Sequence, residues 1–183
     1  MACYFMTDPH FGHENILKFR DYDGNPLRGG FENIEDHDEY IIQEANKVVR
    51  PTDRLYVMGD VAMKQAHIEK IARINGKKVL IRGNHDIFQL SRYSRYFEDV
   101  RACKVLNVPQ ESGGGRVVVT HIPVHTCELL RFRANVHGHL HANRVKLPND
   151  ENDGRYINLC PEIIGYVPKS LEEIYTLLPE RAE

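Results

Sequence analysis

Short apolar runs alternate with helical patterns through the first half of the chain. Three of these runs have the length and composition of buried strands: residues 3–7, 54–58 and 77–82. Between them, apolar positions recur at helical spacing over residues 33–48 and 63–74. This alternation predicts parallel strands joined by crossover helices, an arrangement in which binding groups collect at the carboxyl ends of the strands.

The second half of the chain is richer in short β-like runs and turns. Five further strands are expected, at residues 100–108, 116–120, 134–137, 144–147 and 155–159. The segment from Ser170 to Glu173 has the sequence of a capping box and predicts a last helix that continues through Leu178. We therefore expect an α/β (α+β) fold in which two β-sheets pack on each other as a sandwich and helices flank them.

Length, charge and cysteine usage narrow the class of protein. At 183 residues with 42% hydrophobic content, the chain can bury one core, so we expect a single domain over residues 1–183. Lys and Arg number 24 against 26 Asp and Glu, so the bulk positive charge that favours stable nucleic-acid binding is absent. No apolar run approaches the roughly 20 residues of a membrane span, and the four cysteines form no CxxC pair. These features predict a cytoplasmic protein with free, mostly buried thiols and no membrane partner.

Five polar segments follow apolar runs in a fixed order. They are Asp8-Pro9-His10, Gly59-Asp60, Gly83-Asn84-His85-Asp86, His121 and Gly138-His139-Leu140-His141. Together they contain three carboxylates, one amide and five imidazoles, which is roughly the donor set of two divalent metal ions with one proton donor to spare. In the Asp-x-His and His-x-His segments the two donors are two positions apart, so both point to the same side of an extended chain.

In this order the segments resemble the blocks D-x-H, G-D, G-N-H-[DE], a lone His and G-H-x-H of the calcineurin-like metallophosphoesterase superfamily. The match runs from about residue 3 to residue 160, and the chain resembles small prokaryotic and phage phosphoesterases of that superfamily. The resemblance implies a four-layer α/β/β/α fold that binds two metal ions. One ion would be held by Asp8, His10, Asp60 and His141. The other would be held by Asp60, Asn84, His121 and His139, with Asp60 bridging the two.

The resemblance also implies a catalytic role for His85, which would lie beside the metals as the general acid and be oriented by Asp86. A bound divalent ion lowers the pKa of water towards ~7, so that hydroxide becomes available to attack phosphorus. The neutral amide of Asn84 would limit the negative charge of the site and help it accept phosphate. We therefore expect hydrolysis of a small phosphate ester, with phosphodiesters, nucleotides among them, favoured over monoesters. Mn²⁺ is the expected metal, with Fe, Zn, Ni or Co as alternatives, because nitrogen and oxygen ligands do not select among them.

Two other functions stay open from the sequence. The first is a non-catalytic scaffold of the same fold, against which stands the presence of every expected ligand and of His85. The second is a nuclease, against which the near-neutral charge balance argues mildly. The sequence predicts no particular oligomeric state.

His13 and Arg28 are candidates for substrate contacts. His13 precedes a short helix expected at residues 14–19, in a Phe-Gly-His-x-Asn-Ile segment similar to one in the phage members; the alternative is a helix-start or surface histidine. Arg28 lies in the Gly- and Pro-rich residues 21–31, which predict a loop, and a solvated loop cation is the favoured alternative to a phosphate contact. Structural roles are expected for His125 and His137, and helix-surface positions for His37 and His67.

Overall fold

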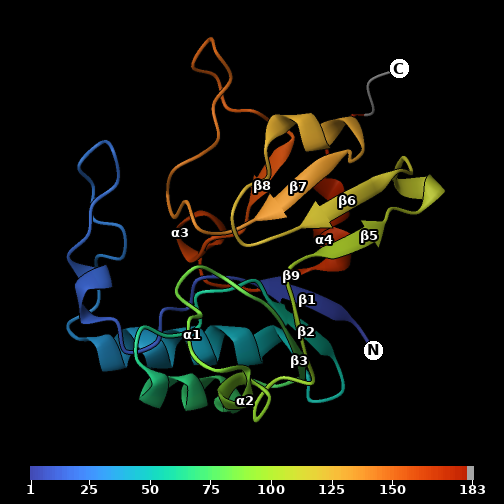
Figure 1. The fold of residues 1–183 in the computed structure, drawn as a ribbon. Helices are drawn as coiled ribbons and strands as arrows, with labels where there is room; N and C mark the ends of the chain where they lie inside the picture. The colour runs from blue at the N-terminus through green and yellow to red at the C-terminus, as the bar shows by residue number, and fades with distance from the viewer. Residues whose placement is uncertain (181–183) are drawn as a thin grey trace.

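Two β-sheets lie face to face in the protein, which a computed structural model describes for residues 1–180 (Figure 1). The first sheet has the strand order β4-β3-β2-β1-β9. Its members are β1 (Cys3–Met6), β2 (Arg54–Val57), β3 (Lys77–Ile81), β4 (Asp99–Arg101) and β9 (Lys169–Ser170). The first four strands are parallel, and β9 pairs antiparallel with β1. The strands predicted at residues 3–7, 54–58 and 77–82 are thus confirmed as the centre of a parallel sheet.

The second sheet has the strand order β5-β6-β7-β8. Its members are β5 (Lys104–Asn107), β6 (Arg116–Val119), β7 (Ala134–His137) and β8 (Tyr156–Asn158). The last three are parallel, and β5 is antiparallel to β6. The single strand predicted at residues 100–108 is wrong, because the chain leaves the first sheet after β4 and enters the second at β5. Val100 packs with the helix-side core of the first sheet, whereas Leu106 lies between the sheets.

Helices cover the outer face of the first sheet. These are α1 (Ile34–Val48), the 3₁₀ helix η2 (Gln65–Arg73) and the short α2 (Leu90–Tyr93), which lie below the sheet in Figure 1. Asn33 caps α1, since its side chain accepts a hydrogen bond from the backbone N–H of Asp36. The helix predicted at residues 63–74 forms as η2, which begins two residues later than expected and has 3₁₀ geometry.

The two sheets share a core built from alternate residues of their strands. Phe5, Tyr56 and Val79 face the second sheet, whose Val117, Val119 and Val136 fill the other side. Ile174 of α4 (Leu171–Thr176) closes this core, and the predicted capping box of Ser170 and Glu173 is confirmed at the start of α4. The apolar runs therefore fold as strands because both faces of each central strand are buried.

The opposite face of the second sheet carries a thin layer. It contains the 3₁₀ helix η4 (Thr126–Leu130), drawn in gold above β7 in Figure 1. The buried Asn135 accepts a hydrogen bond from the backbone N–H of Val124 at 2.9 Å, and the Tyr156 hydroxyl donates to the Val124 carbonyl at 2.9 Å. The expected α/β fold of two stacked sheets flanked by helices is thus confirmed, with one short 3₁₀ helix in its outermost layer.

Three smaller helices and several local features complete the described chain. The helices are η1 (Glu14–Leu17), η3 (Gln110–Ser112) and α3 (Pro161–Ile164). The strand predicted at residues 144–147 is wrong, since this segment forms only an isolated bridge between Lys146 and Asn152. All four cysteines are free thiols, but Cys160 alone is buried, and Cys103 and Cys127 are exposed. No helix within residues 1–180 is long and apolar enough to cross a membrane.

The core between the sheets predicts the effect of shortening Val117, which is fully buried there. Val117→Ala removes two methyl groups and leaves a cavity, so the free energy of unfolding should fall by about 2–3 kcal/mol in urea titrations. Val105→Ala is the matched control: Val105 is 39% exposed on β5, and its loss should change stability by less than about 0.5 kcal/mol. Equal effects of the two substitutions would contradict the packing described here.

Candidate metal centre

Loops that follow five parallel strands meet at one edge of the two sheets. Asp8 comes two residues after β1, and Asp60 comes three residues after β2. The backbone N–H of Asp8 donates to the Gly59 carbonyl at 3.1 Å, and that of His10 donates to the Asp60 carbonyl at 3.0 Å. The second sheet joins its loops in the same way, since the N–H of Gly138 donates to the His121 carbonyl at 2.9 Å. The topology therefore brings the five polar segments of the sequence together.

The backbone of these loops is strained at the candidate ligands. Left-handed φ values between +48° and +69° occur at Asp8, His10, Asp60, His139 and His141. Such values are uncommon for residues other than glycine; each costs of order 1–3 kcal/mol and persists only where the surroundings impose it. Within residues 1–180, only Asp150 and Tyr166 share this conformation among non-glycine residues. Backbone strain is thus concentrated at the residues that were predicted to bind metal.

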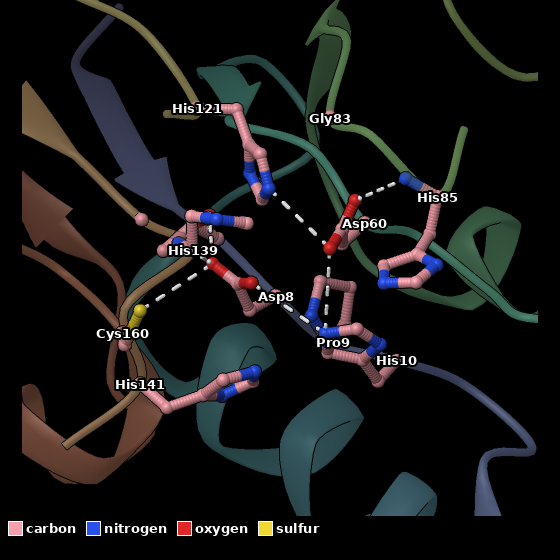
Figure 2. Close-up of polar contacts among 12 residues, drawn as sticks. Asp8, Pro9, His10, Asp60, Gly83, His85, His121, His139, His141 and Cys160 are labelled. Carbon is pink, nitrogen blue, oxygen red and sulfur yellow. Dashed lines mark hydrogen bonds and ion pairs between the residues drawn. The ribbon is translucent and has the colours of Figure 1, made fainter. Parts of the chain in front are cut away.

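Asp8, His10 and His141 form a first cluster, in which one ligand atom from each residue lies within 4.8 Å of the others. The His10 Nε2 atom is 3.5 Å from the Asp8 Oδ1 atom, and both atoms are buried without a hydrogen-bond partner (Figure 2). Buried polar atoms are rarely left unpaired, because each costs its full desolvation energy. A carboxylate oxygen and an imidazole nitrogen that converge in this way fit a divalent cation.

Asp60, His121 and His139 form a second cluster of the same kind. The Oδ2 atom of Asp60 lies 3.3 Å from His121 Nε2 and 3.6 Å from His10 Nε2, so it faces both clusters (Figure 2). Its other oxygen, Oδ1, accepts a hydrogen bond from the backbone N–H of His85 at 2.9 Å. The position of Asp60 between the clusters is the one required of a bridging ligand.

Asn84 and the backbone complete the second cluster. The Asn84 Oδ1 atom lies 3.0 Å from His121 Nε2, and the Asn84 side chain is exposed. His121 Nδ1 donates to the Met58 carbonyl at 2.8 Å, which leaves Nε2 as the nitrogen that faces the cluster. Burial lowers the pKa of His121, but hydrogen bonding to Asp60 and the charge of Asp8 outweigh it and raise the pKa to about 9. In the metal-free protein a proton therefore occupies this position at neutral pH.

Two glycines allow the loops to approach this closely. A Cβ atom on Gly83 would overlap Asp60 Oδ1, and one on Gly138 would overlap both Thr7 Oγ1 and Asp8 Oδ2. The glycines that frame the G-N-H-D and G-H-x-H segments are thus required by packing against the two carboxylates.

Two residues that support Asp8 were not predicted from the sequence. Asp8 Oδ2 accepts from the backbone N–H of His139 at 3.0 Å, and it lies 2.5 Å from Thr7 Oγ1 and 3.4 Å from Cys160 Sγ. These partners leave Asp8 Oδ1 free to face the cluster. Thr7 directly precedes Asp8 in the sequence, just after β1, and this adjacency is the signal that could have identified it.

Glu162 is a further carboxylate that sequence reasoning missed. Its side chain is 3% exposed, and its Oε1 atom accepts a hydrogen bond from His141 Nδ1 at 2.9 Å. Its position just after the strand predicted at residues 155–159 is the available signal, because the candidate ligands also follow their strands. A partner on Nδ1 orients the ring of His141 towards the cluster.

His85 lies at the open side of the centre. Its side chain is exposed, and its ring centroid is 5.8 Å from that of His10 (Figure 2). The predicted orientation of its imidazole by Asp86 is wrong. Instead, the buried Asp86 carboxylate accepts from the backbone N–H groups of Asp60, Val61 and Gly83 at 2.8–3.0 Å. Asp86 therefore fixes the two loops that carry Asp60 and Asn84.

The two candidate substrate contacts differ in their surroundings. His13 is half-buried with its ring centroid 5.4 Å from that of His10, and burial lowers its pKa to about 4. It thus lies beside the first cluster, where its contact with substrate stays a prediction. Arg28 is fully buried, so the expected solvated loop cation is wrong. Its guanidinium points to the carbonyls of Asp8 and Pro9, which gives no support to its predicted phosphate contact.

The remaining histidines have structural surroundings. His137 is buried, as expected, and His125 caps η4 by accepting from the backbone N–H of Cys127. The surface position predicted for His37 is wrong, because its side chain is fully buried beside Arg28. His67 is half-buried against Gly12. The sequence did not reveal these surroundings, because both histidines lie on polar helix faces. The residues that they contact, Arg28 and Gly12, come from loops outside those helices.

Fold and site together define an α/β protein of two stacked sheets whose strand-end loops form paired Asp/His clusters suited to divalent cations. The chain is 31% identical over 180 residues to the uncharacterized protein MJ1445 of Methanocaldococcus jannaschii, a match that covers 96% of this chain and 90% of that protein. It therefore belongs to the same family as MJ1445. No family model matches the chain.

Two other proteins extend the comparison. The Gene 66 protein of Mycobacterium phage L5 is 27% identical over 170 residues, covering 78% of each chain. The crystal structure of AQ665, a protein of unknown function from Aquifex aeolicus, matches with a TM-score of 0.73 and 26% identity over 97% of this chain and 99% of that one. The fold is thus shared over nearly the whole length of a solved structure.

The raised pKa of His121 predicts how the metal-free protein responds to pH. This pKa is about 9 against an ordinary value of 6.5, so the proton stabilises the fold fully below about pH 6.5 and the stabilisation is lost as the pH rises through about 9. The melting temperature of EDTA-treated protein should fall over this range, and less so for His121→Asn. Since a cation requires unprotonated Nε2, calorimetry in buffers of different ionisation enthalpy should show proton release on Mn²⁺ binding at pH 7. Binding without proton release would contradict the assignment.

Proposed function

We propose that the protein is a dinuclear metal-dependent phosphoesterase that hydrolyses phosphate esters, with phosphodiesters favoured over monoesters. The observation that carries the proposal is the shared Asp60: its Oδ2 atom lies 3.6 Å from His10 Nε2 and 3.3 Å from His121 Nε2. Paired cation sites joined by one carboxylate are the arrangement used to hold both oxygens of an in-line displacement at phosphorus. The resemblance of the five segments to calcineurin-like metallophosphoesterases supports the same chemistry.

The residues divide between two cations. Asp8, His10, Asp60 and His141 would hold one, and Asp60, Asn84, His121 and His139 the other. The buried, unpaired Asp8 Oδ1 and His10 Nε2 fit such an ion, and Mn²⁺ suits this mixture of carboxylate, amide and imidazole donors. When bound, the ions supply Lewis-acid activation of the phosphate oxygens and of the attacking water.

His85 is the proposed donor of a proton to the leaving-group oxygen. Its backbone is anchored by the hydrogen bond from its N–H to Asp60 Oδ1, while its ring is exposed and reaches the space beside His10. Asn84, also exposed, adds no charge at the mouth of the site, which favours an anionic phosphate. An exposed acid leaves room for a second ester group, and this is why diesters are favoured.

The proposal is tested first by turnover. With Mn²⁺, the protein should hydrolyse bis(p-nitrophenyl) phosphate, EDTA should abolish the reaction, and His139→Ala should bind one ion fewer and lose roughly 100-fold or more of the activity. A metal-supplemented screen of monoesters, diesters and cyclic nucleotides would then define the substrate. Absence of turnover with Mn²⁺, Fe²⁺, Zn²⁺, Ni²⁺ or Co²⁺ would favour a scaffold, and salt-sensitive binding and cleavage of oligonucleotides would favour a nuclease.

The acid role of His85 is tested by its dependence on the leaving group. His85→Ala should keep both ions, because the side chain is no ligand, and should slow hydrolysis by about 10²–10⁴-fold for an alkyl ester. The loss should be much smaller for a p-nitrophenyl ester, whose leaving group departs without a proton. Equal slowing of the two esters would rule out proton donation by His85.

A further inference from the structure

A buried arginine contacts the loops of the first cluster from behind. The residue, Arg28, is 1% exposed. Its Nη2 donates to the Asp8 carbonyl at 2.7 Å, its Nη1 lies 3.3 Å from the Pro9 carbonyl, and its Nε donates to Glu162 Oε1 at 2.8 Å. The planar fork of an arginine can address several oxygens at once, which a lysine ammonium cannot do in the same geometry.

Glu162 joins this arginine to the other side of the cluster. The oxygen that accepts from Arg28 Nε also accepts from His141 Nδ1 at 2.9 Å. Burial alone would raise the pKa of Glu162, but Arg28 and His141 outweigh it and lower the pKa to about 2. One charged carboxylate therefore connects His141, from the G-H-x-H loop, to the arginine that holds the Asp8-Pro9-His10 turn.

The contacts continue from Arg28 into α1 and back to the turn. Arg28 Nη1 lies 3.1 Å from His37 Nε2, and His37 Nδ1 lies 3.0 Å from Asp38 Oδ1. Since Arg28 can only donate, His37 Nε2 accepts, and its Nδ1–H donates to Asp38. Asp38 Oδ2 in turn accepts from the backbone N–H of Gly12 at 2.8 Å and from Lys70 Nζ at 2.6 Å. The segment from Asp8 to Gly12 is thus held at both ends by one buried network.

We propose that Arg28 and Glu162 are positioning residues for the first cation site, holding His141 and the Asp8-Pro9-His10 turn at the separation a cation requires. The inference rests on the proposed metal centre. The second cluster has other supports: His121 bonds to the Met58 carbonyl, and Asp86 holds the loop of Asp60. No hydrogen bond or ion pair within residues 1–180 joins Arg28 or Glu162 to Asp60, His121 or His139. Loss of the network should therefore weaken one site and spare the other.

The energetics of burial favour such a positioning role. A buried ion pair gains little stability over apolar residues of similar volume, because both ions lose their hydration. Removing only one partner leaves the other charge buried and unpaired, which is strongly destabilising. The double variant Arg28→Met/Glu162→Gln removes both charges with little change in volume, so it separates the positioning role from a general loss of stability.

The experiment measures Mn²⁺ binding by equilibrium dialysis, with the visible spectrum of Co²⁺-loaded protein as a second readout. Wild-type protein should bind two ions. The double variant should bind one of them about 10–100-fold more weakly, keep the affinity of the other, and lose the absorption of one Co²⁺ site. Arg28→Lys should show the same selective loss, because the charge remains and the fork is absent. Val117→Ala, destabilised in the core between the sheets, is the control and should bind both ions normally.

Each outcome has a distinct meaning. If wild-type protein binds fewer than two ions, the proposed dinuclear function fails before the inference is tested. If wild-type protein binds two and the double variant binds both with unchanged affinity, the positioning role is wrong. Equal weakening of the binding of both ions would also overturn the proposal, because the network is proposed to support the first site alone. Should the double variant not fold, Arg28→Lys alone decides by the same criteria.

Discussion

The structure depends on keeping two ionised carboxylates out of water at the same edge of two sheets. Asp8 is fully buried and Asp60 is 2% exposed. An unpaired buried carboxylate is so unfavourable that it ordinarily becomes protonated, yet hydrogen bonds and neighbouring imidazoles lower the pKa of both. Donors saturate Asp8 Oδ2 and leave Oδ1 to the cluster. The charge left over is what a divalent cation would neutralise.

Backbone geometry follows from the same requirement. Side chains at the ends of parallel strands reach a common point only if the chain turns sharply there. Left-handed φ values provide those turns at every Asp and His of the two clusters except His121. Such strain persists only where packing imposes it. The apolar cores on both faces of the first sheet supply that packing, and Gly83 and Gly138 remove the Cβ atoms that would keep the loops apart. The packed sheets therefore maintain the strained backbone of the loops at their edge.

The sequence predicted the features that depend on local patterns, namely the central strands and the candidate ligands that follow them. Runs such as 54–58 are short, apolar and followed by glycine, so strand and ligand could be placed together. The interpretation failed where a contact comes from far along the chain. Arg28, in a Gly-rich loop, has the sequence context of an exposed residue, because loops normally run over the surface. Its burial depends on contacts with Glu162, 134 residues away, and with His37. His37 was likewise expected at the surface, because Arg28, which lies against it, is outside its helix. The change of sheet at residues 102–103 is likewise a tertiary event that no local pattern reports.

The supports of the two clusters differ in kind. Behind the first cluster, the buried side chains of Arg28 and Glu162 form an ion pair, and Arg28 and Asp38 hydrogen-bond to the backbone of the segment from Asp8 to Gly12. The second cluster is supported by the Met58 carbonyl, which accepts from His121, and by the single carboxylate of Asp86, which accepts from the backbone N–H groups of Asp60 and Val61. Asn84 and His85 are exposed on its other side. On this exposed side of the centre the chain therefore presents a neutral amide and an imidazole rather than a carboxylate.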